Sequence, residues 1–251
     1  MEHIHAPSFR SWTNQEGADK ERQNRTNTAL EKMAAVVAWL LECPLPEGDG
    51  IGSVGGGHIQ HSFSYVQNAP VPFVNAVALE KYINKVRFYC LLFEFVFFSQ
   101  ALSRLSGGAG GRQINIQNEE HIFCHSDISL DNFFYDAESD RVWMIDFQHV
   151  NILPRSFFSF HLHASHWGGE FADDVASKLN FPRSPQLNVL EVAADIILQS
   201  DNSSFGEHLE PPSLIQCNFE NRPNPLSIFR NIFTMPHSAP WFNLFQTFEW
   251  E

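Results

Sequence analysis

Positive charge is scarce in this sequence: 16 lysines and arginines stand against 29 acidic residues, which gives a formal net charge of −13 at pH 7. Nucleic acids and anionic lipids are bound through clusters of basic side chains, so this deficit argues against both kinds of partner. An acidic surface suits a cationic small molecule or simply keeps the protein soluble.

Cysteine is also scarce, and the few thiols form no Cys-x-x-Cys pair; they are Cys43, Cys90, Cys124 and Cys217. Such spacing argues against a disulfide framework or a zinc cluster, so we expect a cytoplasmic protein. The first residues lack the apolar core of a signal peptide. The most apolar stretch, Val86 to Leu102, contains Arg87 and Glu94, which predicts a buried helix and not a membrane span.

The 251 residues, 43% of them apolar, allow one substantial domain. The polar stretch from Ser8 to Asn27 predicts a loop or linker. Thr28 and Glu31 have the spacing of a capping box, and Pro44 ends the helix that we expect to follow them. The predicted inward face of that helix is Leu30, Met33, Ala34, Val37 and Leu41.

The glycines between Ile51 and Gly57 predict a tight turn and not a phosphate-binding loop. No Gly-Lys-Ser or Gly-Lys-Thr follows them, the glycine pattern of kinases is absent, and the preceding element is a helix. An irregular loop or small hairpin is expected from His58 to Tyr65.

Further helices are predicted from Asn75 through Tyr82, from Val86 to Leu105, around Val175, and after Ser184-Pro185, where Leu190, Ala193, Ala194 and Ile197 should face inward. Between them, His121 to Val150 is a strand–loop–strand region. The order predicts a mainly α (α+β) fold with helices around a small antiparallel hairpin, without the alternation of a doubly wound sheet.

The chemistry-bearing residues follow the pattern His125-x-Asp127-x-x-x-x-Asn132, then a turn, then an apolar strand that ends in Asp146. Phosphoryl transfer to a hydroxyl requires a carboxylate near the attacking oxygen and oxygen ligands for Mg²⁺. Asp127 and Asn132 share one loop, and a hairpin would return Asp146 to it. The spacing therefore predicts that three oxygen donors converge.

This segment resembles the catalytic loop and metal-binding strand of the aminoglycoside phosphotransferase (kinase-like) family, whose motif is His-Gly-Asp, then Asn, then a second Asp after a hairpin. The resemblance implies that Asp127 is the catalytic base for the substrate hydroxyl. It also implies that Asn132 and Asp146 hold Mg²⁺, and with it ATP, and that His125 braces the catalytic loop. Ser126 departs from the motif because it replaces the usual Gly, which would cost strain at an unusual backbone angle.

The resemblance to large fungal members covers residues 1–206 as a kinase-like C-terminal lobe, whereas 207–251 form an irregular tail without a counterpart. Met1-Glu-His-Ile4 resembles the strand that links the two lobes, so the N-terminal lobe, with its glycine-rich loop and phosphate-pairing Lys, is expected to be missing. The lysines of this chain fall in the predicted linker or helices. A phosphotransferase acting on a small hydroxyl-bearing molecule, truncated and weak or inactive alone, is therefore expected.

Two alternatives remain at this stage. One is a non-catalytic kinase-like module that binds a small molecule or a protein. The other, more distant, is a zinc hydrolase built on His161-x-His163-x-x-His166, whose spacing resembles the HxHxDH signature of metallo-β-lactamase-type hydrolases. Ser165 stands where that signature needs Asp, which favours histidines that are simply hydrogen-bonded in a helix or loop.

Overall fold

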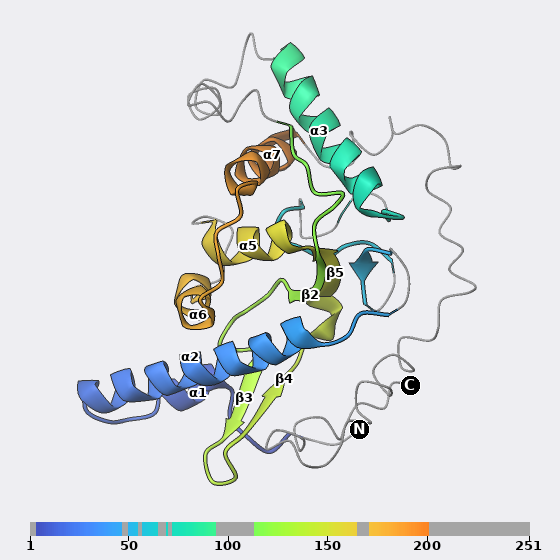
Figure 1. Cartoon of the computed structure of the whole chain (residues 1–251). Helices are drawn as coiled ribbons and strands as arrows, with labels where there is room; N and C mark the ends of the chain where they lie inside the picture. Colours follow the sequence, from blue (N-terminus) through green and yellow to red (C-terminus); the bar gives the residue numbers. More distant parts are fainter. Residues whose placement is uncertain are drawn as a thin grey trace.

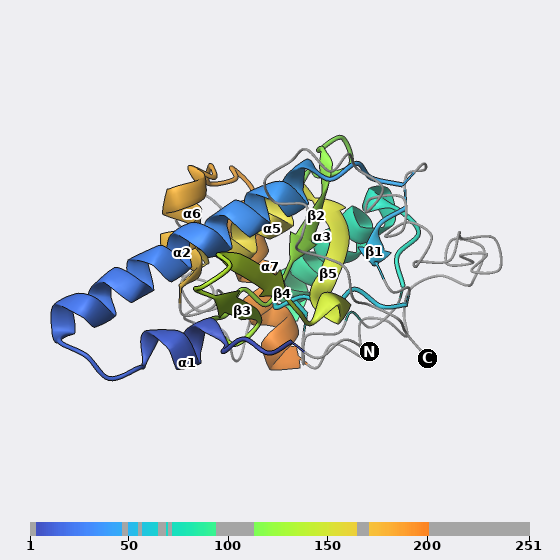
Figure 2. The ribbon, with the colours of Figure 1, turned by 90° about the horizontal axis from the view of Figure 1, so that it is seen from below.

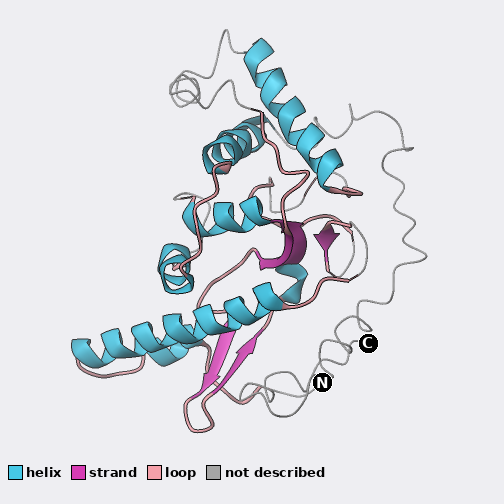
Figure 3. Cartoon of the chain, viewed as in Figure 1, coloured by secondary structure: helices cyan, strands magenta, loops and turns pink. Residues whose placement is uncertain are grey.

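The computed structural model describes residues 4–46, 50–54, 57–64, 69, 72–93, 113–164 and 171–200, and it shows helices around short antiparallel strands (Figures 1 and 3). The helices are α1 (Phe9–Thr13), α2 (Asp19–Glu42), α3 (Ala76–Phe93), α5 (Arg155–His163), α6 (Ala172–Leu179) and α7 (Leu187–Ser200). The strands are β1 (Gly52–Ser53), β2 (His121–His125), β3 (Phe133–Asp136), β4 (Arg141–Met144) and β5 (Val150–Pro154). This confirms the predicted mixture of helices with small antiparallel sheets, while the tail 207–251 lies outside the described residues.

The strands form two sheets, and their register decides where the polar loops meet. One sheet has the order β1-β5-β2, with β5 antiparallel to both neighbours, and the other is the β3–β4 hairpin. In the first sheet His125, the last residue of β2, is the partner of Val150, the first residue of β5. The segment that leaves β2 therefore lies beside the segment that enters β5.

Helix α2 begins at Asp19, so the predicted loop over Ser8 to Asn27 and the predicted capping box at Thr28 are wrong. The helix starts where Ala18 is extended and its N–H donates to the Glu21 carboxylate at 3.3 Å. Acidic side chains in the first turn also stabilise the positive end of the helix dipole. Glu31, the other half of the predicted box, instead forms an ion pair with Lys178 of α6 at 3.2 Å.

The inward face predicted for α2 is confirmed: Leu30, Met33, Ala34 and Val37 are buried, and Leu41 is partly buried against the core. The helix ends at Glu42, before Pro44, as expected. In Figures 1 and 2, α2 runs alongside α6 and the β3–β4 hairpin. Lys32 of α2 pairs with Asp140 of the hairpin turn at 2.5 Å.

The segment before α1 is structured because it adds to the β3–β4 hairpin. Ser8 bridges Phe134 in antiparallel fashion, and the Tyr135 N–H donates to the Pro7 carbonyl oxygen at 3.0 Å. Phe9, fully buried, stacks on Tyr135 with ring centroids 5.5 Å apart. Trp12 also meets Tyr135 edge to face at 4.8 Å, so two aromatic residues order a segment that is otherwise mainly polar in sequence.

The helices predicted after Asn75 and after Ser184 agree with the structure in type and differ in extent, whereas β1, β5 and α5 were not predicted as separate elements. The two helical segments expected after Asn75 are one helix, α3, within its described bounds, and the Asn75 side chain accepts the Ala78 N–H at 3.0 Å. Residues 94–105, the rest of that prediction, lie outside the described part of the chain. The predicted inward residues of α7 are all buried: Leu190, Ala193, Ala194 and Ile197. No helix among the described residues is long and apolar enough to cross a bilayer.

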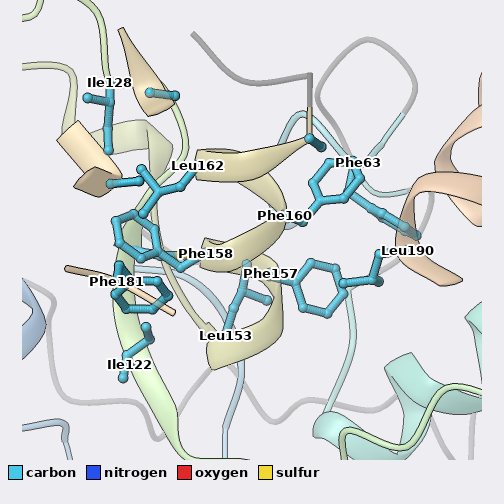
Figure 4. Close-up of a cluster of buried hydrophobic side chains, with 14 of the residues drawn as sticks. Phe63, Ile122, Ile128, Leu153, Phe157, Phe158, Phe160, Leu162, Phe181 and Leu190 are labelled. Carbon is cyan, nitrogen blue, oxygen red and sulfur yellow. The ribbon is translucent and has the colours of Figure 1, made fainter. Parts of the chain in front are cut away.

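Aromatic packing on both sides of α5 forms the centre of the core (Figure 4). Phe158 meets Phe181, the residue after α6 and its Asn180 cap, edge to face at 5.0 Å. On the other side, Phe157 and Phe160 pack against Phe63 with centroids 5.3 and 5.8 Å away. Because α5 directly follows β5, this packing fixes the sheet strand that borders the polar loops.

Phe158→Ala should be severely destabilising because the ring is fully buried and its removal leaves a cavity. We expect a loss of about 3–5 kcal/mol in the free energy of unfolding, measured by urea denaturation. Val77→Ala on α3, where the side chain is 38% exposed, is the control and should cost less than about 1 kcal/mol. Equal losses of unfolding free energy in the two variants would contradict the conclusion that packing on α5 forms the centre of the core.

Candidate functional site

The loop between β2 and β3 carries the predicted catalytic residues and is tied to the segment that precedes β5. The Ser126 N–H donates to the His149 carbonyl oxygen at 2.9 Å. At the other end of the loop, the Ile145 N–H donates to the Asn132 carbonyl oxygen at 2.9 Å. Two main-chain hydrogen bonds thus hold the loop and the Asp146 segment in register.

His125 connects the same two segments through its side chain. Its Nδ1 accepts the Asp127 N–H at 3.1 Å, and its Nε2 lies 3.1 Å from the Ile145 carbonyl oxygen. The accepting Nδ1 carries no proton, so Nε2–H is the donor to Ile145 and the ring is neutral. Burial, the largest cause, lowers the pKa of His125 and keeps it neutral. A buried neutral imidazole therefore sets the positions of Asp127 and Ile145 relative to each other.

Asn132 is held by Asp127, and its amide is thereby oriented. Its Nδ2 donates to the Asp127 carbonyl oxygen at 2.9 Å, and the side chain is buried. Since the nitrogen end is used in this hydrogen bond, the oxygen end of the amide remains for another donor or a cation.

Asp146 has a left-handed backbone, with φ 64° and ψ 46°, at the start of the 3₁₀ helix Phe147–His149. This conformation is uncommon outside Gly, Asn and Asp, and residues that adopt it often lie at turns or functional positions. Ligand atoms of Asp127, Asp146 and His149 lie within 4.8 Å of one another. The structure therefore brings together the two predicted carboxylates and adds His149, which the sequence analysis missed.

His149 is the new member of the site. Its Nε2 lies 3.5 Å from Asp146 Oδ2, and its side chain is 12% exposed. Its Nδ1 is buried and has no hydrogen-bond partner among the described residues. The signal for it was the spacing Asp146-x-x-His149, which one turn of helix brings onto a single side.

Ser126 occupies the Gly position of the motif without the strain considered above, because its φ is not positive. Its hydroxyl donates toward the carbonyl oxygens of Gln60 and His149, at 2.5 and 3.1 Å. Asn151 of β5 donates to the same Gln60 oxygen at 2.7 Å and accepts the Gln60 N–H at 3.1 Å. A serine at this position therefore anchors the segment after the glycine-rich turn to the site.

The histidines of the alternative zinc motif do not share a site within the described residues. His161 and His163 are two positions apart on α5, so their side chains point about 160° apart around the helix axis. His161 Nε2 accepts the Ile128 N–H at 3.4 Å, whereas His163 Nε2 lies 3.1 Å from the Phe181 carbonyl oxygen. His166, the third member, lies outside the described residues.

His61 and His161 form a buried layer behind the β2–β3 loop, with ring centroids 6.1 Å apart. Burial lowers the pKa of each to about 3, so both rings are neutral near pH 7. The Nδ1 of His61 accepts the Phe63 N–H at 3.0 Å. These residues support the loop through packing and hydrogen bonds without adding charge.

Neither a family model nor a curated protein matches this sequence. Functional assignment therefore depends on the geometry of Asp127, Asn132, Asp146 and His149.

Lowering the pH should weaken the fold through the buried histidines. His61 has a folded-state pKa below its unfolded value near 6.5, so its contribution is complete above that value and is lost as the pH falls toward about 3. His61→Asn keeps an acceptor for Phe63 but cannot titrate in this range. We expect the stability gap between wild type and variant to narrow below pH 6.5, by about 1.4 kcal/mol per pH unit.

Urea unfolding of both proteins between pH 5 and 8 measures this gap. Above pH 7 the gap should be constant, which provides the internal control. A gap that stays constant down to pH 5 would contradict a neutral, buried His61.

Proposed function

We propose that this chain is a kinase-like phosphotransferase of the aminoglycoside phosphotransferase type, which transfers the γ-phosphate of ATP to a hydroxyl of a small molecule. One observation carries the proposal. Asp127 is tied to the segment that carries Asp146 through His125, which spans from the Asp127 N–H to the Ile145 carbonyl oxygen. Asn132 is tied to Asp127 by its own side-chain hydrogen bond. These contacts bring a carboxylate base and a second carboxylate together at one end of the sheet.

The proposed role of Asp127 is that of a general base. Its carboxylate orients the substrate hydroxyl and takes its proton as the hydroxyl oxygen bonds to the γ-phosphorus, while the bond from that phosphorus to the bridging oxygen of ADP breaks. Asn132 donates a hydrogen bond to the Asp127 carbonyl oxygen, which restricts the conformation of the loop. The proposed base, Asp127, is therefore positioned before the substrate binds.

Asn132 and Asp146 fit a Mg²⁺ ion, because an amide oxygen and a carboxylate are the hard oxygen ligands that this ion prefers. The Nδ2 of Asn132 is already engaged with Asp127, which leaves its amide oxygen for the ion. When bound, Mg²⁺ would neutralise charge on the ATP phosphates during transfer. The substrate proposed is a small hydroxyl-bearing molecule, and the net charge of −13 favours a cationic one.

A second candidate, a kinase-like module that binds without phosphoryl transfer, is favoured by the positions of the lysines. All five lysines of the chain lie on helices: Lys20 and Lys32 on α2, Lys81 and Lys85 on α3, and Lys178 on α6. None of them therefore corresponds to the strand lysine that pairs with ATP phosphates in kinases. A site of this kind would bind the nucleotide weakly and turn over slowly or not at all, since an electrostatic contact with the transition state is absent.

Calorimetric titration with Mg·ATP, followed by an assay of ATP turnover over a panel of amino alcohols, aminoglycosides and sugars, tests both candidates. Asp146→Asn should weaken Mg·ATP binding at least roughly tenfold, because it removes a charged metal ligand. Asp127→Asn should retain binding and lose roughly a hundredfold or more of any turnover, as expected for a catalytic base.

Glu138→Gln is the matched control, since Glu138 is an exposed carboxylate in the hairpin turn and the variant carries the same change in charge. It should behave as wild type. Binding without turnover would favour the second candidate. Absence of Mg·ATP binding by folded protein would contradict both.

A further inference from the structure

We infer that Asp127, Asp146 and His149 form a binding site for a divalent transition-metal ion, such as Mn²⁺, in preference to Mg²⁺. The inference deepens the proposed function, because Asp127 and Asp146 belong to both the phosphotransferase site and the metal site. The biological use of the ion rests on that proposed function. Binding of the ion itself requires no nucleotide and is tested separately.

The main chain of His149 is fixed more firmly than that of an ordinary loop residue. Its carbonyl oxygen accepts the Ser126 N–H at 2.9 Å and the Asn151 Nδ2–H at 3.0 Å. Its own N–H donates to the Asp146 carbonyl oxygen at 3.1 Å. The imidazole is thus carried by a pre-organised backbone, as a metal ligand requires.

Among the described residues, the side chain of His149 has no hydrogen bond that would occupy its nitrogens. Its Nε2 faces Asp146 Oδ2 at 3.5 Å, too long for a strong hydrogen bond, and its Nδ1 is buried without a partner in the described part of the chain. An imidazole placed beside two carboxylates in this way leaves room for a cation between them.

The spacing of the three groups fits one ion. Bonds of about 2.1 Å from a metal to nitrogen or oxygen place two ligand atoms of the same ion about 3 to 4 Å apart. The ligand atoms here lie within 4.8 Å of one another, so small side-chain rotations would complete the set.

The ligand types decide which ion is preferred. Mg²⁺ favours oxygen ligands in near-ideal octahedral geometry and retains its water, whereas the first-row transition-metal ions, of which Mn²⁺ binds the most weakly, also accept imidazole. Two carboxylates provide charge for any divalent ion, but His149 adds affinity only for those that accept nitrogen. The nitrogen donor therefore gives this site a selectivity that Asn132 and Asp146 alone would lack.

Titration of the nucleotide-free full chain with MnCl₂, monitored by loss of the EPR signal of free Mn²⁺, tests the inference. Wild type should bind one Mn²⁺, and Mg²⁺ should displace it only at roughly tenfold or greater excess. His149→Ala should weaken Mn²⁺ binding roughly tenfold or more and change Mg²⁺ binding by less than about threefold. His58→Gln, which changes an exposed histidine elsewhere, is the control and should match wild type.

His149→Gln is the second variant, which decides the outcome if His149→Ala does not fold by circular dichroism. An amide oxygen in place of the imidazole should retain ion binding and reduce the preference for Mn²⁺ over Mg²⁺. The inference is overturned if folded wild type does not bind Mn²⁺, or if folded His149 variants bind it as tightly and as selectively as wild type. Unchanged binding would mean that His149 contacts Asp146 without being a ligand of the ion.

The proposed function can fail independently. Mn²⁺ binding that depends on His149, without Mg·ATP binding, would support the metal site and contradict the phosphotransferase. Mg·ATP binding that depends on Asp146 but not on His149, together with ion binding that does not distinguish Mn²⁺ from Mg²⁺, would support the phosphotransferase and contradict the transition-metal site.

Discussion

The antiparallel pairing of β2 with β5 determines where the candidate site lies. It places the polar segment that leaves β2 beside the polar segment that enters β5. His125 and Val150 are register partners, so Asp127 and Asp146, although distant in sequence, leave the sheet at the same end. The Ser126–His149 and Ile145–Asn132 main-chain hydrogen bonds extend that pairing beyond the strands. Packing of α5 on the core then holds β5 in place, which links the stability of the aromatic cluster to the geometry of the site.

Neutral histidines form the inner support of this arrangement. His125 and His161 each accept a main-chain N–H from the β2–β3 loop, from Asp127 and Ile128 respectively. Burial lowers the pKa of both rings, so they stabilise the loop without introducing a positive charge near the carboxylates. These two rings therefore contribute no positive charge that would compete with a cation bound at Asp127 and Asp146.

The sequence predicted much of the fold, because periodic apolar residues and the Asp–Asn–Asp spacing are local signals. The inward faces of α2 and α7 follow from such periodicity. The start of α2 could not be found in this way, since its first turns are polar and are fixed by Glu21 and by packing of α1 against the hairpin. His149 was missed for a related reason: its role depends on a 3₁₀ turn and on the register of β5, which are tertiary features that no periodicity expresses.

Asp127 is shared between two roles, and this has a consequence for how the site would use metal ions. A base needs a free carboxylate oxygen, whereas a positive ion bound to the same carboxylate reduces its basicity. Mg²⁺, held by the oxygens of Asn132 and Asp146, would leave Asp127 free to accept a proton. A transition-metal ion drawn toward His149 would recruit Asp127 as a ligand and so compete with the substrate hydroxyl. On this reasoning the balance between Asn132 and His149, two side chains held on the two segments that the sheet brings together, decides whether a bound cation supports phosphoryl transfer or opposes it.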